Sequence, residues 1–177
     1  MNLVNLTKRV HTLNHKWWVD IETGEPVERN IRELLALVIS ELSECLEGER
    51  KGLMDDKITS RRMAEVEMAD AYIRLLDLAG GHEMDEFVVE VKPPKEGFEL
   101  PDNKGDAIYH IMAAVICVEV EDEINMQYLN FSLALIKDYC RRYGYDLFAA
   151  LEEKLAYNMS RQDHTHEARR KTGGKKF

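Results

Sequence analysis

Two pairs of acidic residues lie one helical turn apart in this chain. Glu41 and Glu44 belong to the run ELSE, and Glu67 and Asp70 belong to the run EMAD. A spacing of i, i+3 places both carboxylates of a pair on the same face of a helix. Two such helices side by side bring four carboxylates together, and hard oxygen ligands of this kind suit Mg²⁺, with Mn²⁺ as a substitute. The pattern therefore predicts a metal site with these four residues as ligands.

The second pair supports this prediction more strongly than the first. In the helix expected at 61–79, apolar residues cover two sides and leave a polar stripe between them. The stripe consists of Glu67, Asp70, Arg74 and Asp77. A helix that is apolar around most of its circumference is largely buried, and buried charges need partners or a metal. The alternative to a metal site is a buried ion-pair network around Arg74. For Glu41 and Glu44 the alternative is a solvated helix face, and Glu47 projects to the far side.

A basic segment near the C-terminus has the composition of a phosphate site. Lys154, Asn158 and Arg161 are separated by four and then three residues, which keeps all three on one helical face. Lys and Arg neutralise phosphate oxygens, and Arg does so through two parallel hydrogen bonds. The alternative is an ordinary basic helix end, stabilised by the helix dipole.

These motifs together resemble a known family. The segments SELSE (40–44) and EVEMADAYIRLLDLAG (65–80) resemble the acidic signature of the all-α NTP pyrophosphohydrolases, the superfamily of MazG, dimeric dUTPases and dCTP pyrophosphatases. Residues 33–52 resemble the first MazG-like helix, and EKLAYNMSRQD (153–163) resembles the K-x-x-x-N-x-x-R segment that follows the bundle in these proteins. The resemblance implies Mg²⁺-dependent attack on the α-phosphate of a nucleoside triphosphate, which gives the monophosphate and pyrophosphate.

The resemblance also implies residue roles. Lys154, Asn158 and Arg161 are expected to face the nucleotide, chiefly its phosphates, and the chain is expected to form a homodimer or homotetramer. Glu41 or Glu44 is expected to act as the general base that accepts the proton of the attacking water.

A weaker prediction concerns the nucleobase. Trp17 and Trp18 are adjacent, so they cannot both face the core from one helix, and one of them is available to stack on a base. We take Trp17 and Asn14 as the base-binding residues. The alternative is that one Trp lies in the core and the other in an interface.

Helical periodicity runs through most of the chain. Helices are expected at 3–18, 30–50, 61–79, 106–123, 127–143 and 146–161. This predicts an all-α fold, an antiparallel bundle of about five to six helices in a single domain of residues 1–177, and the resemblance implies that the bundle is MazG-like. Ser60 is the expected cap of the third helix.

Three stretches depart from this simple bundle. Residues 82–125 look like an insertion, and VVEV at 88–91 is the one strand candidate. Residues 163–177 form a basic tail that we expect to be mobile.

The composition narrows the class of protein. The net charge of −9 over 177 residues argues against a nucleic-acid-coating protein, whereas a bound metal would still allow a phosphorylated ligand. Three cysteines without a CxxC pair favour a reducing compartment, and no apolar run is long enough to span a membrane, so we expect a cytoplasmic protein. No E-x-x-H pair occurs in the helical core, which disfavours a di-iron bundle. The remaining rival is a non-catalytic nucleotide-binding or regulatory helical module.

Overall fold

The computed structural model describes residues 2–91 and 99–173 of the chain, and within them the structure is mostly helical. The helices are α1 (Leu3–Asn14), α2 (Ile31–Lys51), α3 (Met63–Gly81), α4 (Lys104–Ile116), α5 (Met126–Tyr143), α6 (Leu147–Ser160) and α7 (His166–Arg170). Short 3₁₀ turns occur at η1 (His15–Trp17), η2 (Asp85–Phe87) and η3 (Gln162–His164). The strands of the described part are β1 (Glu119–Val120) and β2 (Glu123–Ile124), which pair as an antiparallel hairpin. The prediction of an all-α bundle is confirmed.

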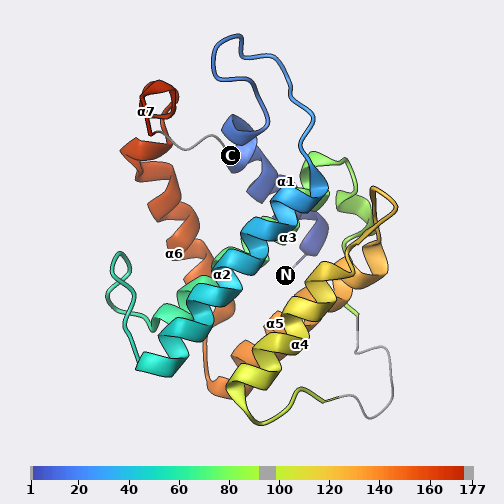
Figure 1. The fold of residues 1–177 in the computed structure, drawn as a ribbon, viewed down its shortest axis with the longest axis vertical. Coiled ribbons are helices and arrows are strands. Elements are labelled where there is room, and N and C mark those ends of the chain that lie inside the picture. Colours follow the sequence, from blue (N-terminus) through green and yellow to red (C-terminus); the bar gives the residue numbers. More distant parts are fainter. Residues whose placement is uncertain (1, 92–98, 174–177) are drawn as a thin grey trace.

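The centre of the bundle is the hairpin of α2 and α3, which α1, α5 and α6 pack around (Figure 1). The Asn30 side chain caps α2 by accepting a hydrogen bond from the Glu33 amide, and Gly52 ends it in the left-handed conformation. At Gly48 the two helices approach so closely that a Cβ atom would lie 3.0 Å from the Ala64 nitrogen. Most residues of α3 are buried, as its apolar circumference predicts. The helix with the EMAD run is therefore held on several sides.

Three predicted helix boundaries were wrong. The first helix ends at Asn14 instead of Trp18, because the chain tightens into the 3₁₀ turn η1. The fourth helix ends at Ile116 instead of Glu123, because the chain turns into the β1–β2 hairpin. The third helix begins after Arg62, whose side chain makes no capping hydrogen bond, so Ser60 is not its cap. The segment 88–91 is not a strand either, although the Val89 amide donates to the Asn130 side chain. These differences lie away from the acidic motifs.

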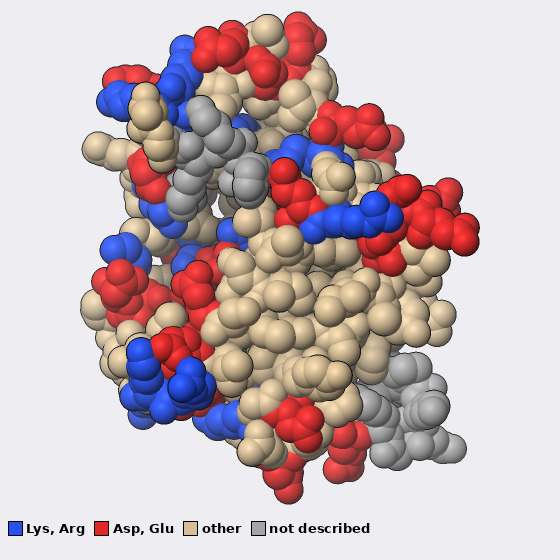
Figure 2. Space-filling view, viewed as in Figure 1, with Lys and Arg blue, Asp and Glu red and all other residues tan. Residues whose placement is uncertain are grey.

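The region 82–125 contributes a helix to the bundle. Ile108 and Ile111 of α4 are fully buried, and α4 packs against α2 and α5. Its opposite side is apolar and exposed: Tyr109 is 65% and Ile116 is 66% exposed. Figure 2 shows a broad area without charged side chains in the middle of the view, where Figure 1 places α2 and α4. We call the outward side of α4, with Tyr109, Met112 and Ile116, the α4 face.

Part of the basic segment 163–177 contacts the N-terminal region. Arg169 of α7 is only 2% exposed, and its guanidinium carbon lies 4.2 Å from the centre of the Trp17 ring. Arg169 also donates a hydrogen bond to the Lys16 carbonyl oxygen, and Arg170 donates to that of Ile21. The sequence pattern did not predict this contact. Residues 174–177, the end of the expected mobile tail, lie outside the described residues.

Two further observations bear on the class of protein. In the described residues, no helix combines the length and the apolar character needed to cross a membrane. All three cysteines are free thiols, and Cys45 and Cys140 are buried.

Candidate metal and nucleotide site

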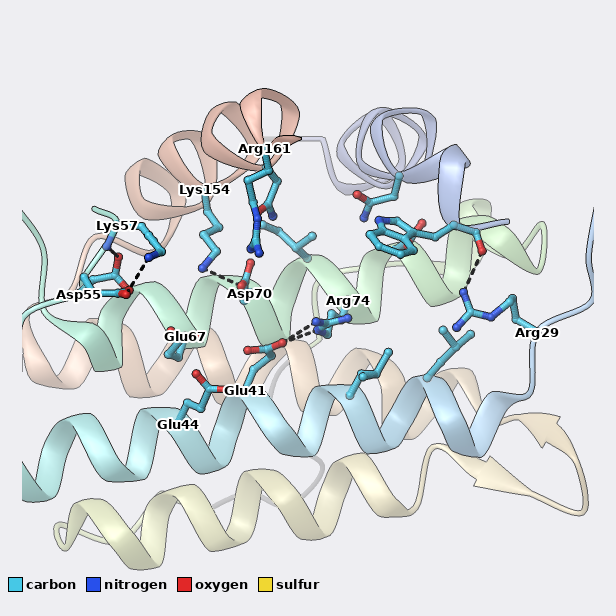
Figure 3. Close-up of a pocket in the computed structure, with 18 residues that line it drawn as sticks. Arg29, Glu41, Glu44, Asp55, Lys57, Glu67, Asp70, Arg74, Lys154 and Arg161 are labelled. Atoms are coloured by element: carbon cyan, nitrogen blue, oxygen red, sulfur yellow. Dashed lines mark hydrogen bonds and ion pairs between the residues drawn. The ribbon is translucent and has the colours of Figure 1, made fainter. Parts of the chain in front are cut away.

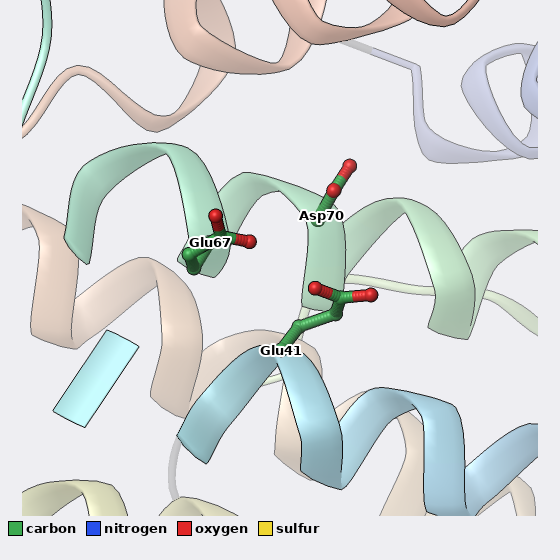
Figure 4. A group of neighbouring side chains, drawn as sticks. All are labelled: Glu41, Glu67 and Asp70. Carbon is green, nitrogen blue, oxygen red and sulfur yellow. The ribbon is translucent and has the colours of Figure 1, made fainter. Parts of the chain in front are cut away.

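Three of the four predicted ligands converge. Glu41 of α2 meets Glu67 and Asp70 of α3, and one carboxylate oxygen from each lies within 4.8 Å of the others (Figure 4). Glu41 and Glu67 are buried, at 7% and 5% exposure. Three hard oxygens on two rigid helices, with room for water or phosphate oxygens, match the needs of a divalent cation such as Mg²⁺. We call Glu41, Glu67 and Asp70 the acidic cluster.

Glu44, the fourth predicted ligand, lies beside the acidic cluster instead of within it. It is exposed and extends from α2 toward Glu67 (Figure 3). Partial burial of its carboxyl group and the neighbouring Glu41 charge raise its pKa. Glu47 does not line the cavity and pairs with Arg50 and Lys51 on the outer side of α2, as predicted.

Two cations contact the acidic cluster. Arg74, one turn beyond Asp70 on α3, donates a hydrogen bond from Nε to Oε1 of Glu41 at 2.7 Å, and its Nη2 lies 2.6 Å from the same oxygen as an ion pair. Lys154 of α6 places its ammonium 2.9 Å from Asp70 Oδ2, and its side chain is buried. The ion pairs that were the alternative to a metal site are thus present. They surround the same oxygens that a metal would use.

The acidic cluster resists full ionisation. Burial raises the pKa of Glu67 to about 9, and the charges of Asp70 and Glu41 add to this shift while Lys154 opposes it. Burial also raises the pKa of Asp70, against the lowering effect of Lys154. Three carboxylates in a poorly solvated space repel each other and lose hydration, so a divalent cation would be the most effective compensation.

The acidic cluster forms one end of a cavity of about 280 Å³ (Figure 3). All nine predicted site residues line it: Asn14, Trp17, Glu41, Glu44, Glu67, Asp70, Lys154, Asn158 and Arg161. They come from α1, η1, α2, α3, α6 and the residue that follows α6, so the fold joins segments more than a hundred residues apart.

Several lining residues were not predicted. The loop before α3 contributes Asp55, which is buried and accepts hydrogen bonds from the amides of Lys57 and Ile58. The run DDK in a polar loop was the available signal. Arg29 also lines the cavity and donates to the Trp17 carbonyl oxygen at 2.8 Å and to Glu33 at 2.7 Å. Its position just before the Asn30 cap carries no comparable signal.

The other end of the cavity is aromatic and apolar. Trp17 lines it together with Leu34, Leu37 and Ile73, whereas Trp18 is buried at 7% exposure. The two indoles therefore separate into a cavity residue and a core residue.

The position of Trp18 depends on α3. Its Nε1 donates to Asp77 Oδ1 at 3.2 Å, and His11 Nδ1 lies 2.9 Å from the same oxygen. A Cβ atom at Gly81 would lie 2.2 Å from the Trp18 ring, so glycine is required there. This packing fixes the backbone that carries Trp17.

The polar residues of α6 face the middle of the cavity. The side-chain oxygen Oδ1 of Asn158 is buried and has no hydrogen-bond partner among the described residues. A buried acceptor of this kind indicates that a donor from a ligand or from water completes its hydrogen bonding. Arg161, which also lines the cavity, is held by both oxygens of Asp163 at 2.9 and 2.6 Å.

Comparison with known proteins adds no assignment. No family model, no curated protein and no solved structure matches the chain. The site must therefore be interpreted from its own chemistry.

Proposed function

We propose that the chain is a Mg²⁺-dependent nucleoside triphosphate pyrophosphohydrolase, which converts a (d)NTP to the (d)NMP and pyrophosphate. The observation that carries this proposal is one cavity that joins the acidic cluster, five basic side chains and an indole. A metal-binding end, phosphate-binding cations and a stacking surface are what a metal-bound nucleotide requires. Leu34 and Glu41 are about 10 Å apart along α2, from the helical rise, which suits a base and an α-phosphate at opposite ends.

Glu41, Glu67 and Asp70 would hold the metal. A bound Mg²⁺ would polarise the α-phosphoryl group and lower the pKa of nearby water. Lys154 and Arg161 would neutralise the phosphate oxygens, including those of the departing pyrophosphate. Trp17 would stack on the base, and the Asn158 carbonyl oxygen would accept a hydrogen bond from a sugar hydroxyl or from a base N–H.

Glu44 is the better candidate for the general base. Glu41 is engaged by Arg74 and belongs to the acidic cluster. Glu44 makes no side-chain ion pair with another described residue, and its raised pKa makes it a stronger base than an ordinary carboxylate. Of the two candidates that the sequence left open, Glu44 is therefore free to take a proton while Glu41 binds the metal.

A turnover panel tests the proposal. Each common NTP and dNTP is mixed with the protein and Mg²⁺, and pyrophosphate and monophosphate are quantified. We expect at least one nucleotide to give equal amounts of both products, only in the presence of metal. Glu47→Gln is the matched control, because Glu47 lies outside the cavity. Absence of turnover with every nucleotide would contradict the proposal.

A second function is favoured by one observation. The ion pairs of Arg74 and Lys154 already satisfy two carboxylates of the acidic cluster, which is compatible with a non-catalytic nucleotide-binding module. Such a module would bind nucleotides in a calorimeter and release no pyrophosphate in the panel.

The α4 face supports the expected assembly of two or more copies. A chain with a net charge of −9 tends to repel a second copy, and on this uncharged face two copies could meet with little repulsion. Light scattering of the wild type and of Ile116→Glu tests this. We expect a homodimer or larger assembly that the variant dissociates, and an identical mass for both proteins would contradict it. A cytoplasmic location stays a prediction.

A further inference from the structure

Arg74 pairs with the acidic cluster and also faces the open cavity. It lies on α3 between Asp70 and Asp77, lines the cavity, and keeps 37% of its side chain exposed. Nε donates to one oxygen of Glu41 and Nη2 forms an ion pair with the same oxygen, as the dashed lines in Figure 3 show. Arg74 is one turn, about 6 Å, beyond Asp70 along the helix. It therefore stands between the acidic cluster and the aromatic end.

This ion pair and a metal ion compete for the same carboxylate. Glu41 Oε1 already accepts a hydrogen bond from Arg74 Nε and pairs with Nη2, and a divalent ion at Glu41 would repel the guanidinium. Lys154 is similarly paired with Asp70, but its side chain is only 8% exposed and its ammonium has little freedom to leave. Arg74 has the exposure and the length to turn within the cavity. A guanidinium released from a carboxylate finds another anionic partner in a phosphate, whose oxygens can accept two parallel hydrogen bonds from it.

We propose that Arg74 exchanges partners during the binding cycle: it holds Glu41 before the metal arrives, and metal binding transfers its guanidinium to phosphate oxygens of the substrate. This inference rests on the proposed function. Arg74 then opposes the binding of metal alone and favours the binding of metal together with a polyphosphate. It makes the binding of the metal and the binding of the polyphosphate depend on each other.

The exchange predicts effects of opposite sign in one variant, Arg74→Gln. The binding of Mn²⁺ alone is followed through the loss of the free-ion electron paramagnetic resonance signal. Removal of the competing cation should tighten Mn²⁺ binding roughly threefold to tenfold. The binding of inorganic tripolyphosphate in saturating Mn²⁺ is followed by calorimetry. Loss of the guanidinium should weaken it roughly tenfold.

Arg50→Gln is the matched control. Arg50 pairs with Glu47 on the outer side of α2, so its removal deletes a similar ion pair outside the cavity. Both binding constants should stay at the wild-type values in this variant. Thermal unfolding of each variant shows that the comparison is made between folded proteins.

The outcomes separate the inference from the proposed function. Weaker binding of both ligands in Arg74→Gln would show that Arg74 only supports the structure, and unchanged binding of both would show that it has no role. Either result overturns the exchange while the turnover panel still tests hydrolysis. If neither the wild type nor Arg74→Gln binds Mn²⁺, the metal site and the exchange both fail. Mn²⁺ binding by the variant alone would support the exchange in its strongest form.

Discussion

The two ends of the cavity are stabilised in different ways. At the acidic end, three carboxylates crowd together and depend on Arg74, Lys154 or a metal for compensation. At the aromatic end, Trp17 is held by the packing of Trp18 and by a hydrogen bond from Arg29 to its own carbonyl oxygen. The crowded carboxylates of the acidic end reduce the stability of the fold and are suited to metal binding, whereas the aromatic end is an extension of the core. Substitutions at the acidic end should therefore lower the rate of the chemical step, and substitutions at the aromatic end should lower the affinity for the nucleotide.

The largest effect is expected at the acidic end. Asp70→Asn removes a charged ligand and leaves Lys154 without its partner, so kcat should fall by about a thousandfold or more through lost stabilisation of the transition state. Steady-state pyrophosphate release measures the change. Turnover by Asp70→Asn at more than a tenth of the wild-type rate would show that the acidic end does not take part in catalysis.

A smaller effect on affinity is expected at the aromatic end. Trp17→Ala removes the stacking surface, worth about 1–3 kcal/mol for a base on an aromatic ring, so KM should rise about tenfold or more. The kcat should stay within about threefold, and Trp17→Phe should recover most of the affinity. A fall in kcat at unchanged KM would show that Trp17 positions the reacting groups instead of the base.

The burial of carboxyl groups at the acidic end should make the free energy of unfolding depend on pH. The pKa of Glu67 is about 9 in the folded chain and near 4.5 when unfolded. Between these values the folded chain keeps a proton that the unfolded chain has lost, so the free energy of unfolding decreases as the pH rises. Glu67→Gln lacks this dependence and should be more stable than the wild type at pH 8, by about 1–3 kcal/mol.

Urea unfolding at pH 5.5 and pH 8 in the presence of EDTA measures this difference. Added Mg²⁺ should stabilise the wild type at pH 8 and leave Glu67→Gln nearly unchanged. Equal pH dependence in the two proteins would mean that Glu67 is ionised in the fold, contrary to the account of the acidic cluster.

The smallest effect separates the cavity from the outer surface of the same helix. Glu47 is one turn from Glu44 and pairs only with exposed cations, so Glu47→Gln should change stability by less than about 0.5 kcal/mol. Its kcat and KM should equal those of the wild type. A loss of activity here would show that the outer side of α2 also contributes to the site, which would remove the distinction between the two sides of α2.

Most helices and the acidic cluster were predictable because both depend on local spacing. The i, i+3 carboxylates and the apolar circumference of α3 predicted the acidic cluster, and Lys154 could be placed in the same site only because of the resemblance. The ion-pair partner of Arg74 was harder to predict from the sequence. A stripe on one helix does not say which residue of the neighbouring helix faces it, and the Arg74–Glu41 ion pair depends on the α2–α3 register.

Other features were hidden from sequence reasoning for physical reasons. The β1–β2 hairpin turns at Glu121 and Asp122, both with positive φ, in place of the glycine or asparagine that usually indicates such a turn. Val118 and Val120 continued the apolar pattern and extended the predicted helix too far. The contact of Arg169 with Trp17 joins the two ends of the chain, and the local pattern of neither segment contains it.

Hydrolysis in ¹⁸O-labelled water tests the central claim most directly. The protein, Mg²⁺ and the best nucleotide of the panel are incubated in labelled water, and the products are identified by mass spectrometry. The account predicts one ¹⁸O atom in the monophosphate, none in the pyrophosphate, and a rate about a thousandfold or more lower in Asp70→Asn. Label in the pyrophosphate, release of inorganic phosphate, or full activity of Asp70→Asn would contradict it.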